Sequence, residues 1–305
     1  MANKIPFYLV TGFLGSGKTT LIKQFIECYA DAKKIAIIQN EYADVNIDSR
    51  ELKQTGKTFE VLEMNNGTVF CVCLLGSFIH SMTDFVCRHK PDMIILEASG
   101  LSDPISVSQI ISTSALRNLI WLAHTYTVVD ALNFQKTIDR VGRNTHQIRV
   151  ADTIVLNKCD LAKETLRDII SKLSVINPFA KIIETSFCNI ELRPGPVFHF
   201  PISVVGKEQP GSPERPDVCS VVIKLTKTIS ADNLDFCIQK YSIITFRIKG
   251  YANTSDGPVA IQTSFGQIEI KPIVENSYHT EIVIIGPDIN QKNLQQEFEN
   301  LCNQN

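Results

Sequence analysis

The chain has 305 residues, of which 44% are hydrophobic and 20% are charged, an ordinary composition for a soluble globular protein. This length predicts two domains and is sufficient to bury a core without covalent cross-links. The net charge of −2 gives no indication of binding to nucleic acid or to an anionic membrane, and no apolar run reaches the about 20 residues needed to span a bilayer.

The N-terminal segment, residues 1–15, does not have the pattern of a secretory signal. Its short apolar run leads into a glycine-rich loop rather than a small-residue cleavage site. We therefore expect a cytoplasmic protein. The nine cysteines are an odd number without framework spacing, so in a reducing compartment we expect free thiols or metal ligands.

From residue 5 to about residue 190, apolar strand segments alternate with segments of helical periodicity. This alternation predicts an α/β domain with a mostly parallel sheet. A polar segment between the fifth and sixth strands also fits a helix. The predicted strands are 5–12, 34–40, 59–64, 92–100, 125–131, 152–158 and 180–186, and the predicted helices are 17–29, 78–90 and 161–177.

The composition changes at residues 193–217, which contain six prolines and three glycines and are typical of a linker. The order that follows is strand, helix, several strands, helix, which predicts a smaller α+β domain whose antiparallel sheet is covered by helices on one face. Its strand segments are 218–226, 242–252, 258–274 and 279–287, and its helices are 230–241 and 288–302. The predicted domains are 1–192 and 218–305, joined by the linker 193–217.

Residues 12–19 fit the phosphate-loop pattern G-x-x-x-x-G-K-[ST], between a predicted strand and a predicted helix as that motif requires. The first domain is therefore predicted to be a P-loop NTPase domain. The glycines allow main-chain N–H groups to point at phosphates, aided by the positive end of the helix. Lys18 is expected to neutralise β- and γ-phosphate charge, and Thr19 to bind Mg²⁺. The alternative is a chance glycine-rich turn. The predicted nucleotide-binding residues of this loop are Gly12, Gly15, Ser16, Gly17, Lys18, Thr19 and Thr20.

A second pattern predicts which nucleotide base is bound. It is the N-K-x-D pattern of Asn157, Lys158 and Asp160, about 140 residues after the phosphate loop. A carboxylate accepts hydrogen bonds from the N1–H and N2–H₂ groups of guanine, a donor pair that adenine lacks. The pattern therefore predicts GTP and GDP as ligands and disfavours an ATP-dependent small-molecule kinase. Thr185 and Ser186 follow the next strand, where a second base-contacting loop is expected.

Glu97 ends an apolar strand in the run E-A-S-G. An acidic residue there reaches the Mg²⁺ or the attacking water, so Lys18 and Glu97 are the predicted catalytic residues; the alternative for Glu97 is a surface carboxylate. Gly100 is expected to bring a main-chain N–H close to the γ-phosphate. No arginine finger is identifiable, so we expect slow turnover, with a nucleotide-dependent homodimer or a partner protein as the candidate sources of activation.

Together, the phosphate loop, E-A-S-G and N-K-C-D resemble the CobW-type GTPases, in the wider group that contains the urease and hydrogenase nickel-insertion GTPases. Residues 11–22 are similar to the family's opening almost residue for residue. Residues 39–48 resemble its N-E-[FY]-G-x-[VI]-x-[IL]-D run, and residues 246–251 its R-x-K-G strand, so the resemblance covers both domains. It implies GTP hydrolysis coupled to metal delivery or to metalloenzyme maturation, with a client metalloenzyme or corrinoid protein as partner.

The metal motif departs from the family, which usually carries three cysteines in N-G-C-x-C-C after the third strand. Anchoring the motif on Asn66-Gly67 places Thr68, Phe70 and Cys71 at the three positions, and sliding it places Cys71, Cys73 and Leu74 there. Neither register supplies three thiolates, and a closed zinc site needs four ligands.

The resemblance implies that Cys71 and Cys73 bind a transition metal, Zn²⁺ or Co²⁺, with Glu41, Asp48 or His80 as candidate further ligands. The alternative is that both are ordinary buried thiols. The six histidines are dispersed, so no metal-storage tract is present. A second hypothesis is accordingly a GTP-dependent module that docks on a client protein and no longer handles metal.

Overall fold

The computed structural model describes residues 4–40, 55–64, 72–98, 107, 110–111, 113–138, 142–192, 218–264, 267–273, 279–287 and 289–302. The chain divides into two compact units, Met1–His199 and Phe200–Asn305. Within the described ranges, no helix combines the length and the apolar character that crossing a membrane requires.

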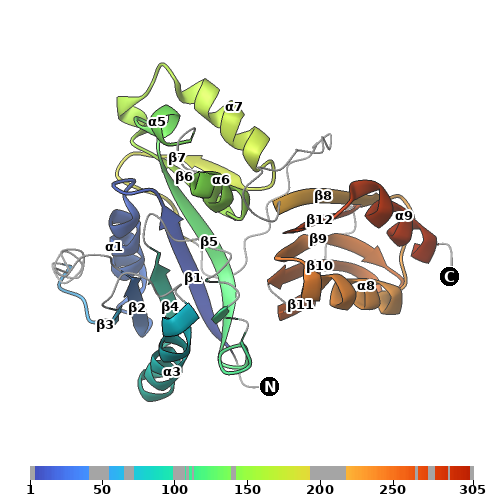
Figure 1. The fold of residues 1–305 in the computed structure, drawn as a ribbon, viewed down its shortest axis with the longest axis horizontal. Helices are drawn as coiled ribbons and strands as arrows, with labels where there is room; N and C mark the ends of the chain where they lie inside the picture. The colour runs from blue at the N-terminus through green and yellow to red at the C-terminus, as the bar shows by residue number, and fades with distance from the viewer. Residues whose placement is uncertain are drawn as a thin grey trace. The chain divides into compact units, whose positions relative to one another are not determined.

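Apolar strands form the centre of the first unit, with helices against both of their faces (Figure 1). In the described part of this unit, seven strands form one parallel sheet in the order β3-β2-β4-β1-β5-β6-β7. Phe7 and Leu9 pack into the same cluster as α3, whereas Tyr8 and Val10 pack against α1. Burial of both strand faces explains the nearly continuous apolar runs in the sequence. The strands are β1 (Ile5–Gly12), β2 (Ile35–Asn40), β3 (Glu60–Met64), β4 (Met93–Glu97), β5 (Ile120–Asp130), β6 (Thr153–Asn157) and β7 (Lys181–Glu184).

The helices of this unit are α1 (Lys18–Tyr29), α3 (Val72–His89), α5 (Phe134–Ile138), α6 (Gly142–Arg149) and α7 (Leu166–Ile176), with a short 3₁₀ helix η1 (Cys159–Leu161). The strand β1 lies between β4 and β5, so the strand order changes direction there. In parallel sheets, such a switch point opens a crevice at the carboxyl ends of the strands. The described segments that follow β1, β5, β6 and β7 begin along this edge.

Two elements of the first unit are longer than the sequence pattern predicts. Strand β5 begins at Ile120 rather than at residue 125, because Ile120 pairs with Ile5 and extends the central pairing of the sheet. Helix α3 begins at Val72, ahead of the periodic segment that starts at residue 78. The polar segment between β5 and β6 forms the two short helices α5 and α6.

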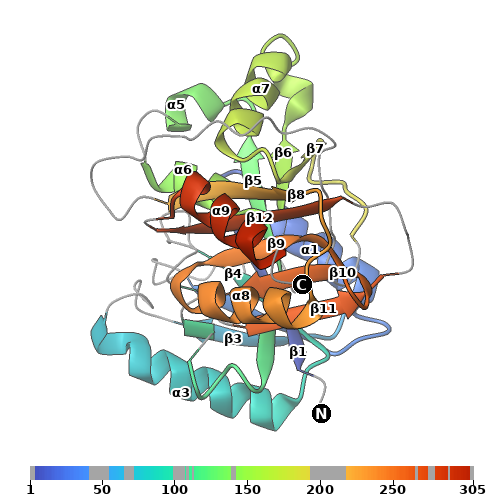
Figure 2. The same ribbon diagram turned by 90° about the vertical axis from the view of Figure 1, so that its right-hand side faces the viewer.

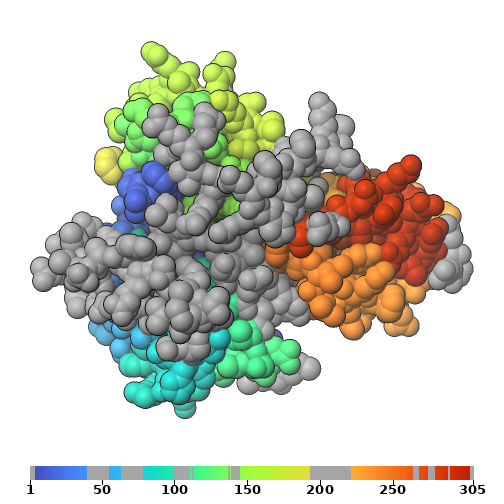
Figure 3. Space-filling view, in the orientation of Figure 1, coloured from blue at the N-terminus to red at the C-terminus, as the bar shows by residue number. Residues whose placement is uncertain are grey.

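The second unit has the predicted antiparallel sheet, with α8 and α9 on one face (Figure 2). Leu234 and Ile238 of α8 and Phe298 of α9 bury their side chains in one cluster against the strands. The two helices lie side by side, orange and red in Figure 3, and Lys240 Nζ lies 2.6 Å from a Glu297 carboxylate oxygen. The described strand order is β11-β10-β9-β12-β8. The elements are β8 (Val218–Leu225), α8 (Ala231–Ile244), β9 (Arg247–Thr254), β10 (Gly257–Ser264), β11 (Gln267–Pro272), β12 (Thr280–Pro287) and α9 (Gln291–Cys302).

The assignment of residues 242–244 to a strand is wrong, because α8 continues through Ile244. The isoleucines at 243 and 244 favour a strand by propensity, but tertiary packing overrides that preference. Tyr241 and Ser242 are buried on the sheet side of the helix, and Thr245 donates its N–H to the Tyr241 carbonyl to end it.

Two glutamines of α9 cover the free edge of β8. Gln295 accepts from the Lys224 N–H at 3.0 Å and donates to its carbonyl at 2.7 Å. Gln291 accepts from the Val222 N–H at 2.9 Å and also donates to the Val222 carbonyl. The side-chain amides thus imitate the hydrogen bonds of a neighbouring strand, which protects a sheet edge against pairing with another chain.

Gln291→Ala is expected to destabilise the second unit by about 1–2 kcal/mol, because it removes two hydrogen bonds from partly buried main-chain groups. The measurement is urea unfolding followed by circular dichroism. Gln296→Ala, at an exposed position on the same helix, is the matched control and should be neutral. Equal stability of the two variants would show that the edge gains nothing from the glutamine.

Candidate nucleotide-binding site

The phosphate loop joins the end of β1 to the start of α1. Gly17, the N-cap of α1, has a left-handed conformation (φ 111°, ψ 24°) and makes no side-chain capping bond. The first turn of α1 contains no acidic residue. The first N–H groups of a helix need a partner, and the helix dipole favours a negative one. This uncapped N-terminus therefore offers its N–H groups to an anion.

Two glycines of this loop are required by close approach of neighbouring strand ends. A Cβ on Gly12 would lie 2.2 Å from the Val128 carbonyl oxygen of β5, and a Cβ on Gly17 would lie 2.5 Å from Asn157 Nδ2. Both have positive φ. Ser16 Oγ is buried beside Gly12 and has no hydrogen-bond partner among the described residues. The loop is thus packed directly onto the ends of β5 and β6.

Gly17→Ala is expected to weaken GDP binding on the order of tenfold to a hundredfold. The alanine meets both a disfavoured φ and the Asn157 amide, so the loop must shift away from its observed path. Titration with a fluorescent GDP analogue measures the effect. Gly56→Ala is the matched control, because Gly56 also has a positive φ but its added Cβ meets nothing within 4 Å. Equal affinity of the two variants would contradict the packing argument.

Lys18, Thr19 and Glu97 lie together at this loop. The Lys18 ammonium lies across the loop and donates to the Phe13 carbonyl at 3.3 Å. Thr19 Oγ1 donates to one oxygen of Glu97 at 3.1 Å, and Gln39 Nε2 at the end of β2 donates to the other at 3.3 Å. Glu97 is only 7% exposed, so it is not a surface carboxylate. Its two oxygens are held beside the start of α1.

Asn157 and Lys158 bind the phosphate loop from the end of β6. Asn157 Nδ2 donates to the Ser16 carbonyl at 2.9 Å, and Lys158 Nζ donates to the Gly15 carbonyl at 2.8 Å. Lys158 has a left-handed conformation (φ 62°), which turns the chain sharply after the strand. These contacts bring together two motifs that lie far apart in the sequence.

Asp160 is exposed on the 3₁₀ helix that follows, and Ser186 Oγ donates to its carboxylate at 2.6 Å. Thr185 is buried, its hydroxyl donates to the Asn189 carbonyl at 2.9 Å, and its own carbonyl accepts from the Cys159 N–H. Thr185 therefore shapes the loop, whereas Ser186 reaches the carboxylate. Thr20 lies in the first turn of α1. Gly100 lies outside the described residues.

Asp130, at the end of β5, belongs to the site although the sequence motifs did not include it. Its carboxylate accepts from Lys158 Nζ at 2.7 Å and from the N–H of Leu132 and Asn133. Burial opposes its ionisation, but hydrogen bonds from Lys158 and Asn133 outweigh burial and lower the pKa of the carboxyl. Asp130 therefore holds the Lys158 ammonium over the phosphate loop. An acidic residue ending a strand next to β1 is the signal that could have identified it.

Cys188 is a second residue that the motifs did not include. Its N–H donates to Asn157 Oδ1 at 2.9 Å, and its thiol contacts the Gly17 carbonyl at 3.3 Å. Burial raises the pKa of this thiol to about 12, so it stays protonated at neutral pH. Nothing in the sequence distinguishes it from the other scattered cysteines.

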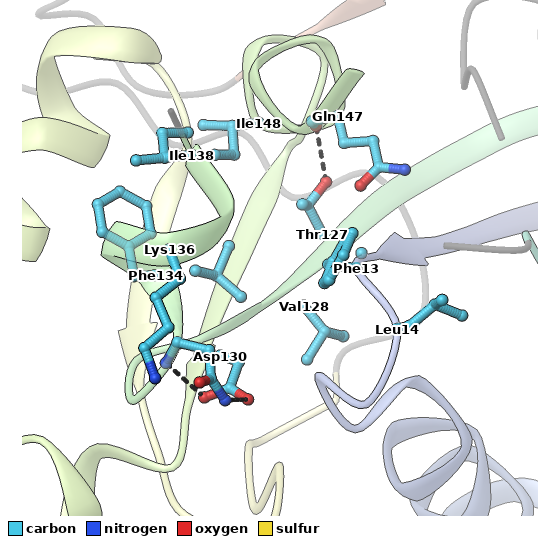
Figure 4. Close-up of a pocket in the computed structure, with 13 residues that line it drawn as sticks. Phe13, Leu14, Thr127, Val128, Asp130, Phe134, Lys136, Ile138, Gln147 and Ile148 are labelled. Atoms are coloured by element: carbon cyan, nitrogen blue, oxygen red, sulfur yellow. Dashed lines mark hydrogen bonds between the residues drawn. The ribbon is translucent and has the colours of Figure 1, made fainter. Parts of the chain in front are cut away.

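A pocket adjoins the outer side of the phosphate loop, between β5, α5 and α6 (Figure 4). Apolar side chains such as Phe13, Phe134 and Ile148 line it, and Thr127 Oγ1 donates to the Gln147 carbonyl at 2.7 Å across it. It encloses about 190 Å³, less than the roughly 300 Å³ at the lower limit of typical ligand sites. Its apolar lining does not suit phosphate, so the uncapped start of α1 remains the better anion site.

The predicted transition-metal ligands Cys71, Glu41 and Asp48 lie outside the described residues, as do the other motif residues from 66 to 70. The side chain of Cys73 is also not described. The backbone places Cys73 in the first turn of α3. His80 is 80% exposed, with Asp84 of the same helix at 3.9 Å. Over the part of the chain that the structure covers, no three His, Cys, Asp or Glu side chains form a group that could hold a metal ion.

Comparison with known proteins matches both units. Residues 6–184 match the nucleotide-binding domain family CobW/HypB/UreG, and residues 218–302 match the cobalamin synthesis protein CobW C-terminal domain. The sequence is 32% identical over 187 residues to the zinc chaperone CobW of a Sinorhizobium species, covering 52% of each chain. It is 28% identical over 227 residues to zinc-regulated GTPase metalloprotein activator 1 of Dictyostelium discoideum, covering 62% of this chain and 47% of that protein.

The chain thus spans about half the length of the curated relatives it matches. Among solved structures, it resembles Zn(II)-bound YjiA GTPase from E. coli with a TM-score of 0.61 and 19% identity, over 98% of this chain and 99% of that one. This likeness supports the fold, and the predicted P-loop and C-terminal α+β architecture is confirmed. Through residues 6–184 the chain belongs to the CobW/HypB/UreG family, and this domain is followed by a CobW C-terminal domain at residues 218–302.

Proposed function

We propose that this protein is a cytoplasmic GTPase that acts as a metallochaperone, using its nucleotide state to control delivery of a metal to a client metalloprotein. The observation that carries the proposal is the contact between the two motifs. Asn157 and Lys158 hydrogen-bond to main-chain carbonyls of the phosphate loop at 2.9 and 2.8 Å. A base read by Asp160 and phosphates bound at α1 would therefore belong to one nucleotide.

Hydrolysis of GTP joins a water oxygen to the γ-phosphorus and breaks the bond from that phosphorus to the β–γ bridging oxygen. In our proposal, the N–H groups at the start of α1 and Lys18 bind the phosphates, and Glu97 orients the attacking water or the metal ligands. Thr19 and Glu97 present adjacent oxygen ligands of the type that Mg²⁺ prefers. Bound there, Mg²⁺ would neutralise charge that develops on the phosphate oxygens.

The metal is the cargo of this proposed reaction. The relatives include a zinc chaperone and a zinc-regulated GTPase metalloprotein activator. We propose Zn²⁺ or Co²⁺ for this chain, bound by Cys71 and Cys73 with Glu41 as a further ligand. The backbone supports one part of this, because Cys73 lies in the first turn of α3. A thiol near a helix N-terminus has a lowered pKa and binds metal more readily as thiolate.

The experiment compares nucleotides and metals in one preparation. Calorimetry should show GDP and GTP binding with a clear preference over ADP and ATP. Metal analysis of protein purified without chelator should find Zn²⁺ or Co²⁺, lost in a variant carrying Cys71→Ser and Cys73→Ser. Equal affinity for ATP and GTP would overturn the guanine assignment.

A second candidate is a GTP-dependent module that docks on a metalloenzyme or corrinoid protein without binding metal itself. The cysteine pair favours it, because the chain carries two thiols where the family usually has three. Absence of cysteine-dependent metal from the purified protein would support this candidate.

For both candidate functions, we propose that the chain consists of the units 1–192 and 218–305, joined by the linker 193–217. We also propose that dimerisation or the client accelerates hydrolysis, so the specific rate should rise with protein or client concentration.

A further inference from the structure

Phe187 is an exposed aromatic residue at the carboxyl edge of the parallel sheet. Its side chain is 79% exposed, on the loop that follows β7. Two other large apolar side chains are exposed after the carboxyl ends of strands of this sheet, Leu14 in the phosphate loop and Leu161 directly after Asp160. A single exposed apolar residue is common on protein surfaces, so the backbone and the contacts of its loop decide whether Phe187 has a role.

The loop that carries Phe187 is fixed on both sides by residues of the nucleotide site. Ser186 donates its hydroxyl to the Asp160 carboxylate at 2.6 Å. Cys188 donates its N–H to Asn157 Oδ1 at 2.9 Å and contacts Gly17 through its thiol. Phe187 and Cys188 both have left-handed backbones, with φ of 56° and 54°. A bulky residue rarely adopts that conformation, and such strain concentrates at binding sites.

Lys158 lies on the side of Asp160 that faces away from Phe187 in the strand order. Its ammonium is held by Gly15 and Asp130, toward the strands β1 and β5. Phe187 comes from β7, on the opposite side of β6 in the strand order. Asp160 follows β6 and thus lies, in the order of the sheet, between a lysine stem held toward β5 and an aromatic ring from β7. A purine whose edge reaches Asp160 has two faces, and the Lys158 stem and the Phe187 ring approach Asp160 from opposite sides in this order.

We propose that Phe187 stacks on one face of the purine base and that the loop 185–189 is strained in order to present it. This assignment rests on the proposed function, since it deepens the recognition of the same nucleotide. Stacking on an aromatic side chain is largely independent of which base is bound. Phe187 therefore supplies affinity for the base, whereas Asp160 supplies the choice of guanine.

Phe187→Ala is expected to weaken GDP binding about tenfold, and Phe187→Trp to restore it. Affinity for tripolyphosphate, which has no base, should be unchanged in both variants. Calorimetry measures all three, and urea unfolding should show unaltered stability because the side chain is exposed. Phe236→Ala, which removes an exposed phenylalanine from α8 in the other unit, is the matched control. In a double variant carrying Trp121→Phe and Phe187→Trp, GDP should also quench the tryptophan fluorescence.

Wild-type GDP affinity in Phe187→Ala would overturn the proposal. So would an equal loss for GDP and tripolyphosphate, because the residue would then act on the loop rather than on the base. A failure of the proposed function would be seen separately, because a wild-type protein that prefers ADP over GDP contradicts guanine recognition. The same Phe187 variants would then test stacking on the base with ADP as the ligand. Dimerisation that depends on Phe187 but not on nucleotide would assign the ring to a protein interface and would also overturn stacking.

Discussion

Glu97→Gln is expected to reduce the rate of GTP hydrolysis about 100-fold or more while leaving the fold intact. Glutamine can keep the hydrogen bond from Gln39 through its oxygen, and its amide can donate to the Thr19 hydroxyl in place of the bond that Thr19 now donates. It loses the negative charge that would bind Mg²⁺ or orient water, and such groups contribute about 10²–10⁴ in rate. Phosphate release under saturating GTP measures the effect.

Glu184→Gln provides the matched control for this substitution. Glu184 also ends a strand of the same sheet, but its side chain is exposed and away from the phosphate loop. Hydrolysis by Glu184→Gln should equal that of the wild type, and both variants should bind GDP. A Glu97→Gln protein that hydrolyses GTP at the wild-type rate would remove Glu97 from the reaction.

Asp160→Asn is expected to weaken GDP binding on the order of 100-fold and to reverse the preference between guanine and xanthine. The carboxylate would accept two hydrogen bonds from guanine, each worth about 1.5–3 kcal/mol because the acceptor is charged. The asparagine amide can instead donate to the C2 carbonyl of xanthine. Competition between GDP and XDP against a fluorescent nucleotide measures the reversal.

Asp168→Asn removes the same charge from an exposed position in the first turn of α7 and is the control. It should leave both affinities unchanged. Loss of GDP and XDP affinity to the same extent in Asp160→Asn would show that the residue supports the loop, through Ser186, and does not read the base.

The motif residues were predictable because their spacing is set by chemistry. A phosphate loop must follow a strand and begin a helix, and Lys18 and Thr19 occupy those places in the structure. The parallel order of the sheet then brings Asn157 to the same edge, as the alternating strands and helices predict. Both the fold class and the family are confirmed on this basis.

Other contributions could not be predicted, because they depend on which strands become neighbours. Asp130 acts through Lys158, 28 positions away, and Cys188 acts through Asn157 and Gly17. Gln291 and Gln295 satisfy a strand edge whose exposure follows from the strand order alone. Single-sequence periodicity contains no information on such pairings. The same limit explains residues 242–244, where burial of Tyr241 against the sheet outweighs strand propensity.

In the proposed function, the bound nucleotide controls the affinity of the protein for its metal. In sequence, the cysteine pair lies between β3 and β4, and β4 ends at Glu97 in the nucleotide site. Coupling between two such sites is typically 5- to 150-fold in affinity. The most direct test is a competition titration of Zn²⁺ against a chromogenic chelator, with the protein loaded with GDP or with a non-hydrolysable GTP analogue. We expect Zn²⁺ affinities that differ at least fivefold between the GDP-loaded and the GTP-analogue-loaded protein. Equal affinities would contradict coupling between the nucleotide and the metal.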